Sequence, residues 1–305
     1  MNARHSALLG IASLGFFALG VSACSGAPND EASGQTDEDL AIESSEAAHA
    51  RPTTQNAATA GASLTTSAAK PHLTYRGGKV LPSVKIVAVY WGNKVQYTGL
   101  LDVYYSNIVK SSYFDWLNEY DTPKQSIGRG SFVRGVTLSP STSAAHLSDG
   151  AIQKELSKQI GSHTLPAPDG VNTLYMVHFP PGVSISGPPG VGDSCKQFCA
   201  YHSAFKRSGK MVYYGVHPDF GSGGCENVCG AGTNFDNLTE ASSHEMMEAV
   251  TDAVPGKGWY DDHNGEVGDI CAYQTTWVDG FKVQLEWSQR RGECVAAPAH
   301  KGGPF

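Results

Sequence analysis

The pattern of apolar and polar positions from residue 84 onwards predicts strands that alternate with helices. Runs rich in β-branched and aromatic residues predict strands, the third of them central, at 84–91, 132–138, 171–179 and 211–216. Helical spacing of apolar residues predicts two pieces within 100–120, a helix over 148–160 with a Ser-Asp cap, and a helix from near Asn237 to before Pro255. Alternation in 281–287 predicts an outer strand, and Gly- and Pro-rich composition predicts loops at 180–193 and 217–235. Together these elements predict one α/β or α+β domain with a central mixed sheet flanked by helices.

The N-terminus has the pattern of an export signal. Arg4 and His5 precede an apolar run, 7–21, that is too short to span a bilayer comfortably. The run ends in small residues before Cys24, which resembles a bacterial lipoprotein signal over residues 1–23. Cys24 would then be acylated and would anchor the protein to a membrane. The alternative is an ordinary secretory signal with an incidental Cys24, and both predict an exported protein, held in the cell envelope (outer membrane or surface) or secreted.

Residues 24–70 have the composition of a disordered tether. They are rich in Ala, Ser, Thr and Gly, lack aromatic residues, and cannot bury enough apolar surface to offset the entropy of ordering. Seven acidic residues against Arg51 and Lys70 give this segment −5 of the formal net charge of −7. The remaining domain, 71–305, is therefore close to neutral, and the absence of a basic patch in its sequence argues against a nucleic-acid partner.

The cysteines predict a disulfide-stapled domain. Besides Cys24 the chain has six, an even number that in an exported protein indicates three disulfides. The pairing that we expect joins neighbours in sequence: Cys195–Cys199, Cys225–Cys229 and Cys271–Cys294. The first two pairs could instead form a four-thiolate zinc site, although an oxidising environment weighs against it.

The segment 244–248, His-Glu-Met-Met-Glu, is the strongest candidate for chemistry. On a helix, His244 and Glu248 share one face and could hold one cation. Glu245 would stand beside that cation as a general base for a bound water. The segment differs from the His-Glu-x-x-His motif of zinc peptidases because Glu248 takes the place of the second histidine. It predicts a zincin-like active-site helix.

Acidic residues downstream supply the other predicted ligands. A zinc hydrolase needs about three protein ligands and an open position for water. Glu266 is the predicted third ligand, with Asp269 as a supporting or substitute ligand. One imidazole and two carboxylates would leave Zn²⁺ a weak Lewis acid, so Mn²⁺ and Ca²⁺ remain alternatives.

Other interpretations of these residues stay open. One alternative is a helix that presents a solvated acidic face. Another is a calcium loop formed by the acids of 261–269, although their spacing differs from that of an EF-hand. His178, at the end of a predicted strand, is a second candidate catalytic residue that could act as an electrophile. For His178, His217 and His202 the alternative is a purely structural role.

Motifs spread over residues 71–297 resemble the Exordium-like (phosphate-induced) extracellular proteins. They are Tyr75-Arg76-Gly77-Gly78-Lys79, Tyr90-Trp91-Gly92, the two Cys-x3-Cys segments, Trp259-Tyr260, 266–271 and Val283-Gln284-x2-Trp287. The resemblance implies an extracellular protein associated with cell walls, in a family without a settled activity. Typical plant members lack the His-Glu segment, so this chain is closer to a bacterial or fungal branch. The resemblance thus implies that the architecture does not require a metal.

Two functions follow. The first is a metal-dependent hydrolase of the metallopeptidase type, acting on a peptide or a cell-wall polymer. The second is a non-catalytic envelope protein that binds polysaccharide through its aromatic residues: Trp91, Tyr213, Tyr214, Trp259, Tyr260 and Trp277. The oligomeric state does not follow from the sequence.

Overall fold

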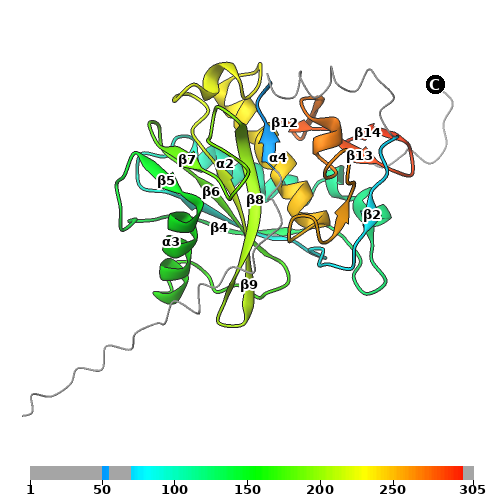
Figure 1. Cartoon of the computed structure of the whole chain (residues 1–305), viewed down its shortest axis with the longest axis horizontal. Helices are drawn as coiled ribbons and strands as arrows, with labels where there is room; N and C mark the ends of the chain where they lie inside the picture. Colours follow the sequence, from blue (N-terminus) through cyan, green and yellow to red (C-terminus); the bar gives the residue numbers. More distant parts are fainter. Residues whose placement is uncertain (1–49, 55–69, 298–305) are drawn as a thin grey trace, which may run out of the picture. The chain divides into compact units, whose positions relative to one another are not determined.

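A six-stranded mixed sheet organises the computed structural model, which describes residues 50–54 and 70–297 (Figure 1). In spatial order its strands are β1 (Ala50–Pro52), β8 (Phe198–Arg207), β9 (Lys210–His217), β6 (Thr173–His178), β3 (Lys85–Tyr90) and β4 (Ser131–Thr137). Strands β9, β6, β3 and β4 run parallel, whereas β8 is antiparallel to β9 and β1 is antiparallel to β8. The predicted α/β or α+β class with a central mixed sheet is confirmed.

Helices cover both faces of this sheet, so each face has a core of its own. One core contains alternate residues of β3 and β6, such as Ile86 and Met176, beneath α2 (Thr98–Ile108) and α4 (Asn234–Thr251). The other contains the intervening residues, such as Val87, beneath α3 (Asp149–Gly161). Strands buried on both faces lose the apolar–polar alternation of half-exposed strands, which explains the continuous apolar runs in the sequence.

The remaining elements are short. Two-stranded pairings join β5 (His146–Ser148) with β7 (Ser184–Ser186), β2 (Thr74–Tyr75) with β10 (Trp259–Tyr260), β11 (Thr275–Val278) with β12 (Phe281–Gln284), and β13 (Glu286–Ser288) with β14 (Glu293–Val295). Single 3-10 turns lie at η2 (Ser112–Phe114), η3 (Leu117–Tyr120), η4 (Cys225–Asn227) and η5 (Asp269–Cys271).

Three sequence-based expectations differ from the structure. The sequence pattern did not predict β8, because it is buried on both faces and mixes small and polar residues with aromatic ones. The expected outer strand over 281–287 is divided into β12 and β13 and is largely buried. Helix α4 begins before Asn237, because a capping box of Thr233 and Asp236 satisfies its first backbone N–H groups.

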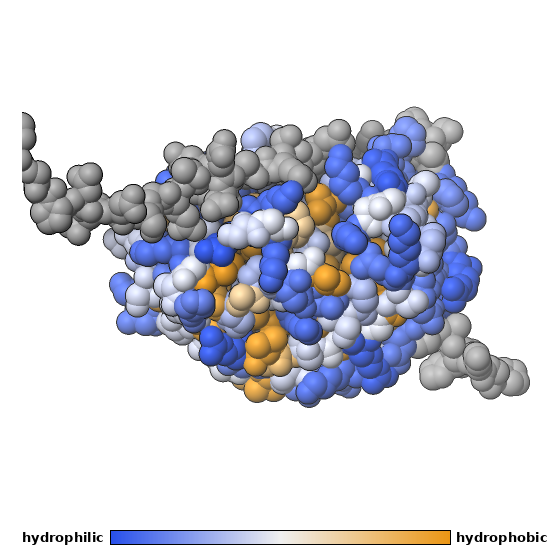
Figure 2. Space-filling model, turned by 90° about the horizontal axis from the view of Figure 1, so that it is seen from below, coloured by the Kyte–Doolittle hydropathy of each residue, from blue (hydrophilic) through white to orange (hydrophobic). Residues whose placement is uncertain are grey.

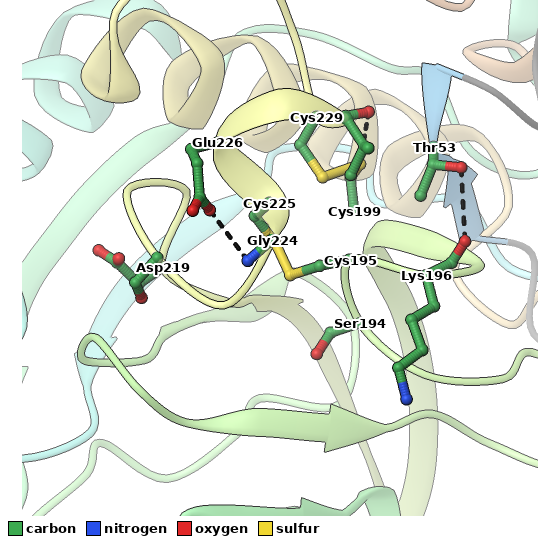
Figure 3. Close-up of a disulfide and its surroundings, with 12 residues drawn as sticks. Thr53, Ser194, Cys195, Lys196, Cys199, Asp219, Gly224, Cys225, Glu226 and Cys229 are labelled. Carbon is green, nitrogen blue, oxygen red and sulfur yellow. Dashed lines mark hydrogen bonds between the residues drawn. A yellow bond between two sulfur atoms is a disulfide. The ribbon is translucent and has the colours of Figure 1, made fainter.

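The disulfides connect the two Cys-x3-Cys segments to each other. Cys195 pairs with Cys225 and Cys199 with Cys229 (Figure 3), so the expected pairing of neighbours is wrong for these four cysteines. The reason lies in the fold, which places the start of β8 against the loop that contains η4. The third expected pair, Cys271–Cys294, is confirmed. With all six cysteines paired, the four-thiolate zinc alternative is excluded.

The disulfides fit a non-cytoplasmic domain. Its three disulfides are typical of an oxidising compartment. Within the described part of the chain, no helix is both long and apolar enough to cross a membrane. On the face shown in Figure 2, hydrophobic residues reach the surface between hydrophilic ones. The predicted signal, residues 1–23, and most of the predicted tether, 24–70, lie outside the described residues. Residues 50–54 of that segment differ from the prediction and are ordered, because β1 pairs with β8 and Arg51 forms a buried ion pair with Glu240.

Candidate functional site

Helix α4 carries the predicted site and is buried along most of its length. From Asn237 to Thr251 every side chain is buried. Glu245 and Glu248 are both 0% exposed, which excludes a solvated acidic face for them. The helix ends at Thr251 because Asp252 leaves the helical conformation and Pro255 follows shortly afterwards. A buried helix with acidic side chains needs compensating groups around it.

The first compensating group is His202, which comes from β8. Its side chain is on the sheet face that α4 covers and is 0% exposed. His202 Nδ1 lies 3.4 Å from Glu245 Oε2 and 3.5 Å from Glu248 Oε2. On the opposite side of the ring, Nε2 is 3.2 Å from the backbone oxygen of Asp252. If Nε2 carries the proton and donates it to this carbonyl, Nδ1 presents a lone pair to the two carboxylates.

The second compensating group is His244, on the far side of Glu248. Its Nε2 lies 3.1 Å from Glu248 Oε1 and 4.0 Å from Asp269 Oδ1. The side-chain nitrogen of Gln284 is 2.8 Å from Nδ1 and holds the ring in place. Glu248 therefore lies between two imidazoles, one from the sheet and one from its own helix.

A glycine makes this packing possible. A Cβ atom on Gly268 would lie 2.7 Å from His244 Nδ1 and 2.9 Å from Glu248 Oε1, closer than real Cβ atoms approach other atoms. Gly268 O also accepts a hydrogen bond from the Gln284 amide. Only the absence of a side chain at this position allows the loop before η5 to close over the cluster.

Many polar atoms of the cluster have no hydrogen-bond partner among the described residues. They are His202 Nδ1, His244 Nε2, both Glu245 oxygens, Glu248 Oε2 and both Glu266 oxygens. The 3.1 Å approach of His244 to Glu248 is an ion-pair distance without hydrogen-bond geometry. Buried polar groups are normally satisfied, so such a concentration of orphaned atoms at one place indicates a missing partner.

The buried imidazoles and carboxylates of the cluster shift one another's pKa values. Burial alone lowers the pKa of His202, but the Glu245 and Glu248 carboxylates outweigh it and raise the pKa to about 10. Glu248 likewise overcomes burial and raises the pKa of His244 to about 10. Burial raises the pKa of Glu245, whereas the imidazoles lower that of Glu248 in spite of burial. The carboxylates thus require about two positive charges, which either two imidazolium protons or one divalent cation could supply.

The geometry fits a divalent metal ion. Ligand atoms of His202, Glu245 and Glu248 lie within 4.8 Å of one another, and so do those of His244, Glu248 and Asp269. Two ligands bound tetrahedrally to zinc at ~2.0–2.1 Å are separated by about 3.4 Å. The separations of Glu248 from His202 Nδ1, 3.5 Å, and from His244 Nε2, 3.1 Å, are close to this value. The residues present therefore fit a metal ion. Imidazole nitrogen and carboxylate oxygen are both donors that zinc accepts.

The predicted ligands are not all at the same place. His244, Glu248 and Asp269 come together, whereas Glu266 lies on the other side of His202, with Oε1 3.5 Å from Nε2. Burial raises the pKa of Glu266 well above its usual value, and the charge of Glu248 adds to this shift. Glu266 is thus better suited to orient His202 than to bind the same cation as Glu248.

His202 is a residue for which sequence reasoning favoured a structural role over a functional one. Its signal in the sequence is weak, because it is not on α4 and its strand was not predicted. His202 follows closely after the first Cys-x3-Cys segment, but this position does not indicate its partners. That this histidine lies beside α4 follows only from the pairing of β8 with β9, which local sequence patterns do not reveal.

His178, the second predicted catalytic residue, makes a different set of contacts. Its Nε2 lies 2.9 Å from the hydroxyl of Tyr105, and its ring stacks on His217 at 4.7 Å. Burial lowers the pKa of both histidines, that of His217 to about 3. These neutral rings form a polar group of their own, and no contact of His178 with the α4 carboxylates is found among the described residues.

The aromatic residues considered for sugar binding do not all reach the surface. Trp91, Tyr213 and Tyr214 are buried, whereas Trp277 is 61% exposed. A separate open cleft of about 330 Å³ lies at the carboxyl ends of β3 and β6, lined by Trp91, Lys94, Pro140 and Pro180 among others. It has no cluster of acidic or histidine side chains.

Comparisons of the chain with family models, with curated proteins and with solved structures gave no match in any of the three. The resemblance to Exordium-like proteins therefore stays a prediction from the sequence motifs. The evidence for the candidate site is therefore the geometry of its residues alone.

Proposed function

We propose that this protein is an exported metal-dependent hydrolase of the metallopeptidase type. His202, His244 and Glu248 would hold a divalent cation, and Glu245 would act as the general base. The observation that carries the proposal is the set of buried, unpartnered nitrogen and oxygen atoms from β8 and α4 that face one another. Leaving them without a cation or protons would cost several kcal/mol.

Including His202 changes the charge of the proposed ligand set. Two neutral imidazoles and one carboxylate leave a zinc complex with a net positive charge, which favours Lewis acidity. The set expected from the sequence, with one imidazole and two carboxylates, would leave no net charge. Two histidines and a glutamate with one open position form a usual ligand set of catalytic zinc.

The chain's own groups have distinct roles in this proposal. The carbonyl of Asp252 would hold the His202 ring, and Gln284 would hold that of His244. When bound, the metal would lower the pKa of a water molecule towards ~7 and polarise a substrate carbonyl. Glu245 would then receive the water proton and pass it to the leaving group, since its carboxylate lies beside His202, one of the proposed ligands.

The first experiment measures metal content and hydrolysis together. The purified full chain, with disulfides formed, is analysed by mass spectrometry for bound metal and is assayed on a mixture of unstructured peptides. Glu245→Gln should keep the metal and lose at least 100-fold in rate. Glu293→Gln, at an exposed position, is the matched control.

Three outcomes separate the possibilities. Metal with peptide cleavage that depends on Glu245 supports the hydrolase. Metal without cleavage would leave a binding or structural site. An absence of metal, after zinc has been supplied, would mean that two imidazolium protons neutralise the cluster and would overturn the proposal.

A further inference from the structure

Residues 50–54 lie along the free edge of the sheet, far in sequence from the elements that they contact (blue in Figure 1). Strand β1 pairs antiparallel with β8, with Ala50 opposite Tyr201, Arg51 opposite Ala200 and Pro52 opposite Phe198. Backbone N–H groups of Thr53 and Thr54 continue the contact by donating to Gln197 O and Val228 O. Figure 3 shows Thr53 beside Lys196, next to the disulfide-linked loops.

Arg51 anchors this segment in a closed pocket. The side chain is 0% exposed. Its guanidinium forms a buried ion pair with Glu240 of α4 and lies 4.2 Å from the centre of the Tyr273 ring. It also donates to the backbone oxygen of Cys229 at 3.4 Å. Carboxylate, aromatic face and carbonyl are the three kinds of group that recognise a guanidinium.

The rest of the segment has few features of a core strand. Ala50, Pro52, Thr53 and Thr54 offer small or polar side chains, so the strand contributes little apolar surface. It is held by backbone hydrogen bonds, by the Tyr273 hydroxyl on the Pro52 carbonyl at 2.5 Å, and by one charged anchor. This combination is the one by which sheet edges bind extended peptides.

We propose that the edge of β8, with Glu240 and Tyr273, is a binding site for an extended peptide that carries an arginine, and that residues 50–54 occupy it in cis. The segment would then compete with peptides from other proteins. The register of β1 on β8 also relates this site to His202. A strand that continued this pairing by one residue before Ala50 would lie opposite His202. A bound peptide would thus run past the strand that supplies the proposed metal ligand, and this last step rests on the proposed function.

The test uses the full chain with a site-specific protease sequence in place of residues 58–64. After cleavage, a fluorescent peptide with the sequence of residues 47–56, AAHARPTTQN, is added in excess, and binding is followed by anisotropy. The cleaved protein should bind the peptide and release its own N-terminal fragment, whereas the uncleaved protein should not bind. Replacing the peptide's arginine by alanine should weaken binding about 30-fold, because the buried Glu240 would lose its guanidinium partner and keep only Lys282, whose Nζ lies 2.7 Å from Oε2.

Two variants sharpen the result. Glu240→Gln in the protein should weaken binding of the arginine peptide, whereas Glu293→Gln, at an exposed position, should not. Equal binding of the arginine and alanine peptides would overturn the proposal. So would unfolding of the cleaved domain when the fragment leaves, because the segment would then be a structural strand. The anisotropy measurement requires no metal and no catalysis, so its failure is distinguishable from failure of the hydrolase.

Discussion

His202 Nδ1 lies 3.4 Å from Glu245 Oε2, although one residue comes from a strand and the other from a helix. This contact joins β8 to the His-Glu segment of α4, so that the cluster includes residues from the sheet as well as from the helix. We therefore expect His202→Ala to weaken zinc binding at least tenfold, as measured by competition with a chromogenic chelator. His146→Ala, at an exposed histidine, should leave the affinity unchanged. Equal affinity in the two variants would remove His202 from the site.

Gly268 tests the packing of the cluster without changing a charged group. Gly268→Ala should destabilise the domain by about 1–3 kcal/mol, because the new methyl group overlaps His244 and Glu248. It should also reduce metal affinity. Gly150→Ala is the control, since nothing lies within 4 Å of the added Cβ and the position is in α3. Chemical denaturation of both variants measures the difference, and a Gly268→Ala protein as stable as the control would contradict the described geometry.

Removal of the proposed metal should lower stability. A ligand that binds only the folded state stabilises it by about 4 kcal/mol when its concentration is 1,000 times Kd. A chelator should therefore lower the melting temperature of the full chain, and added zinc should restore it. In His202→Ala the chelator should have much less effect. A melting temperature that is insensitive to both reagents in the wild type would argue for protons in place of the metal.

Buried His217, which stacks on His178, predicts that the free energy of unfolding falls at acid pH. Burial lowers the pKa of His217 to about 3 in the folded state, well below the value of ~6.5 for an unfolded histidine. The unfolded chain therefore takes up the proton first as pH falls. This contribution to stability is complete above about pH 6.5 and is lost progressively towards pH 3.

Denaturation of two variants over this pH range checks the prediction. His217→Asn, whose amide can still donate to Val177 O, should flatten the fall in unfolding free energy by nearly one proton. His163→Asn, at an exposed position, should keep the wild-type slope. An unchanged slope in His217→Asn would mean that His217 does not stay neutral in the fold.

The sequence predicts the architecture well where patterns are local. The run 84–91 and the Ser148 cap are local signals, and β3 and α3 are present within a residue or two. The pairing of Cys195 with Cys225 depends on which loops meet, which spacing within each Cys-x3-Cys segment does not reveal.

The candidate site is predictable only in part for the same reason. His244, Glu245 and Glu248 are one helical turn apart, so their proximity follows from the helix itself. His202 lies beside them because β8 pairs antiparallel with β9. Glu266 lies on the other side of the His202 ring, near Nε2. Neither of these contacts produces a periodic pattern in the sequence.

The crossed disulfides have a consequence for when the cluster can form. Cys195 and Cys199 stand just before or within the strand that supplies His202, and their partners stand just before the helix that supplies Glu245 and Glu248. Oxidation therefore ties together the two elements whose contact creates the cluster. A newly made chain in a reducing environment would lack both ties, so completion of the site would be delayed until these four cysteines are oxidised.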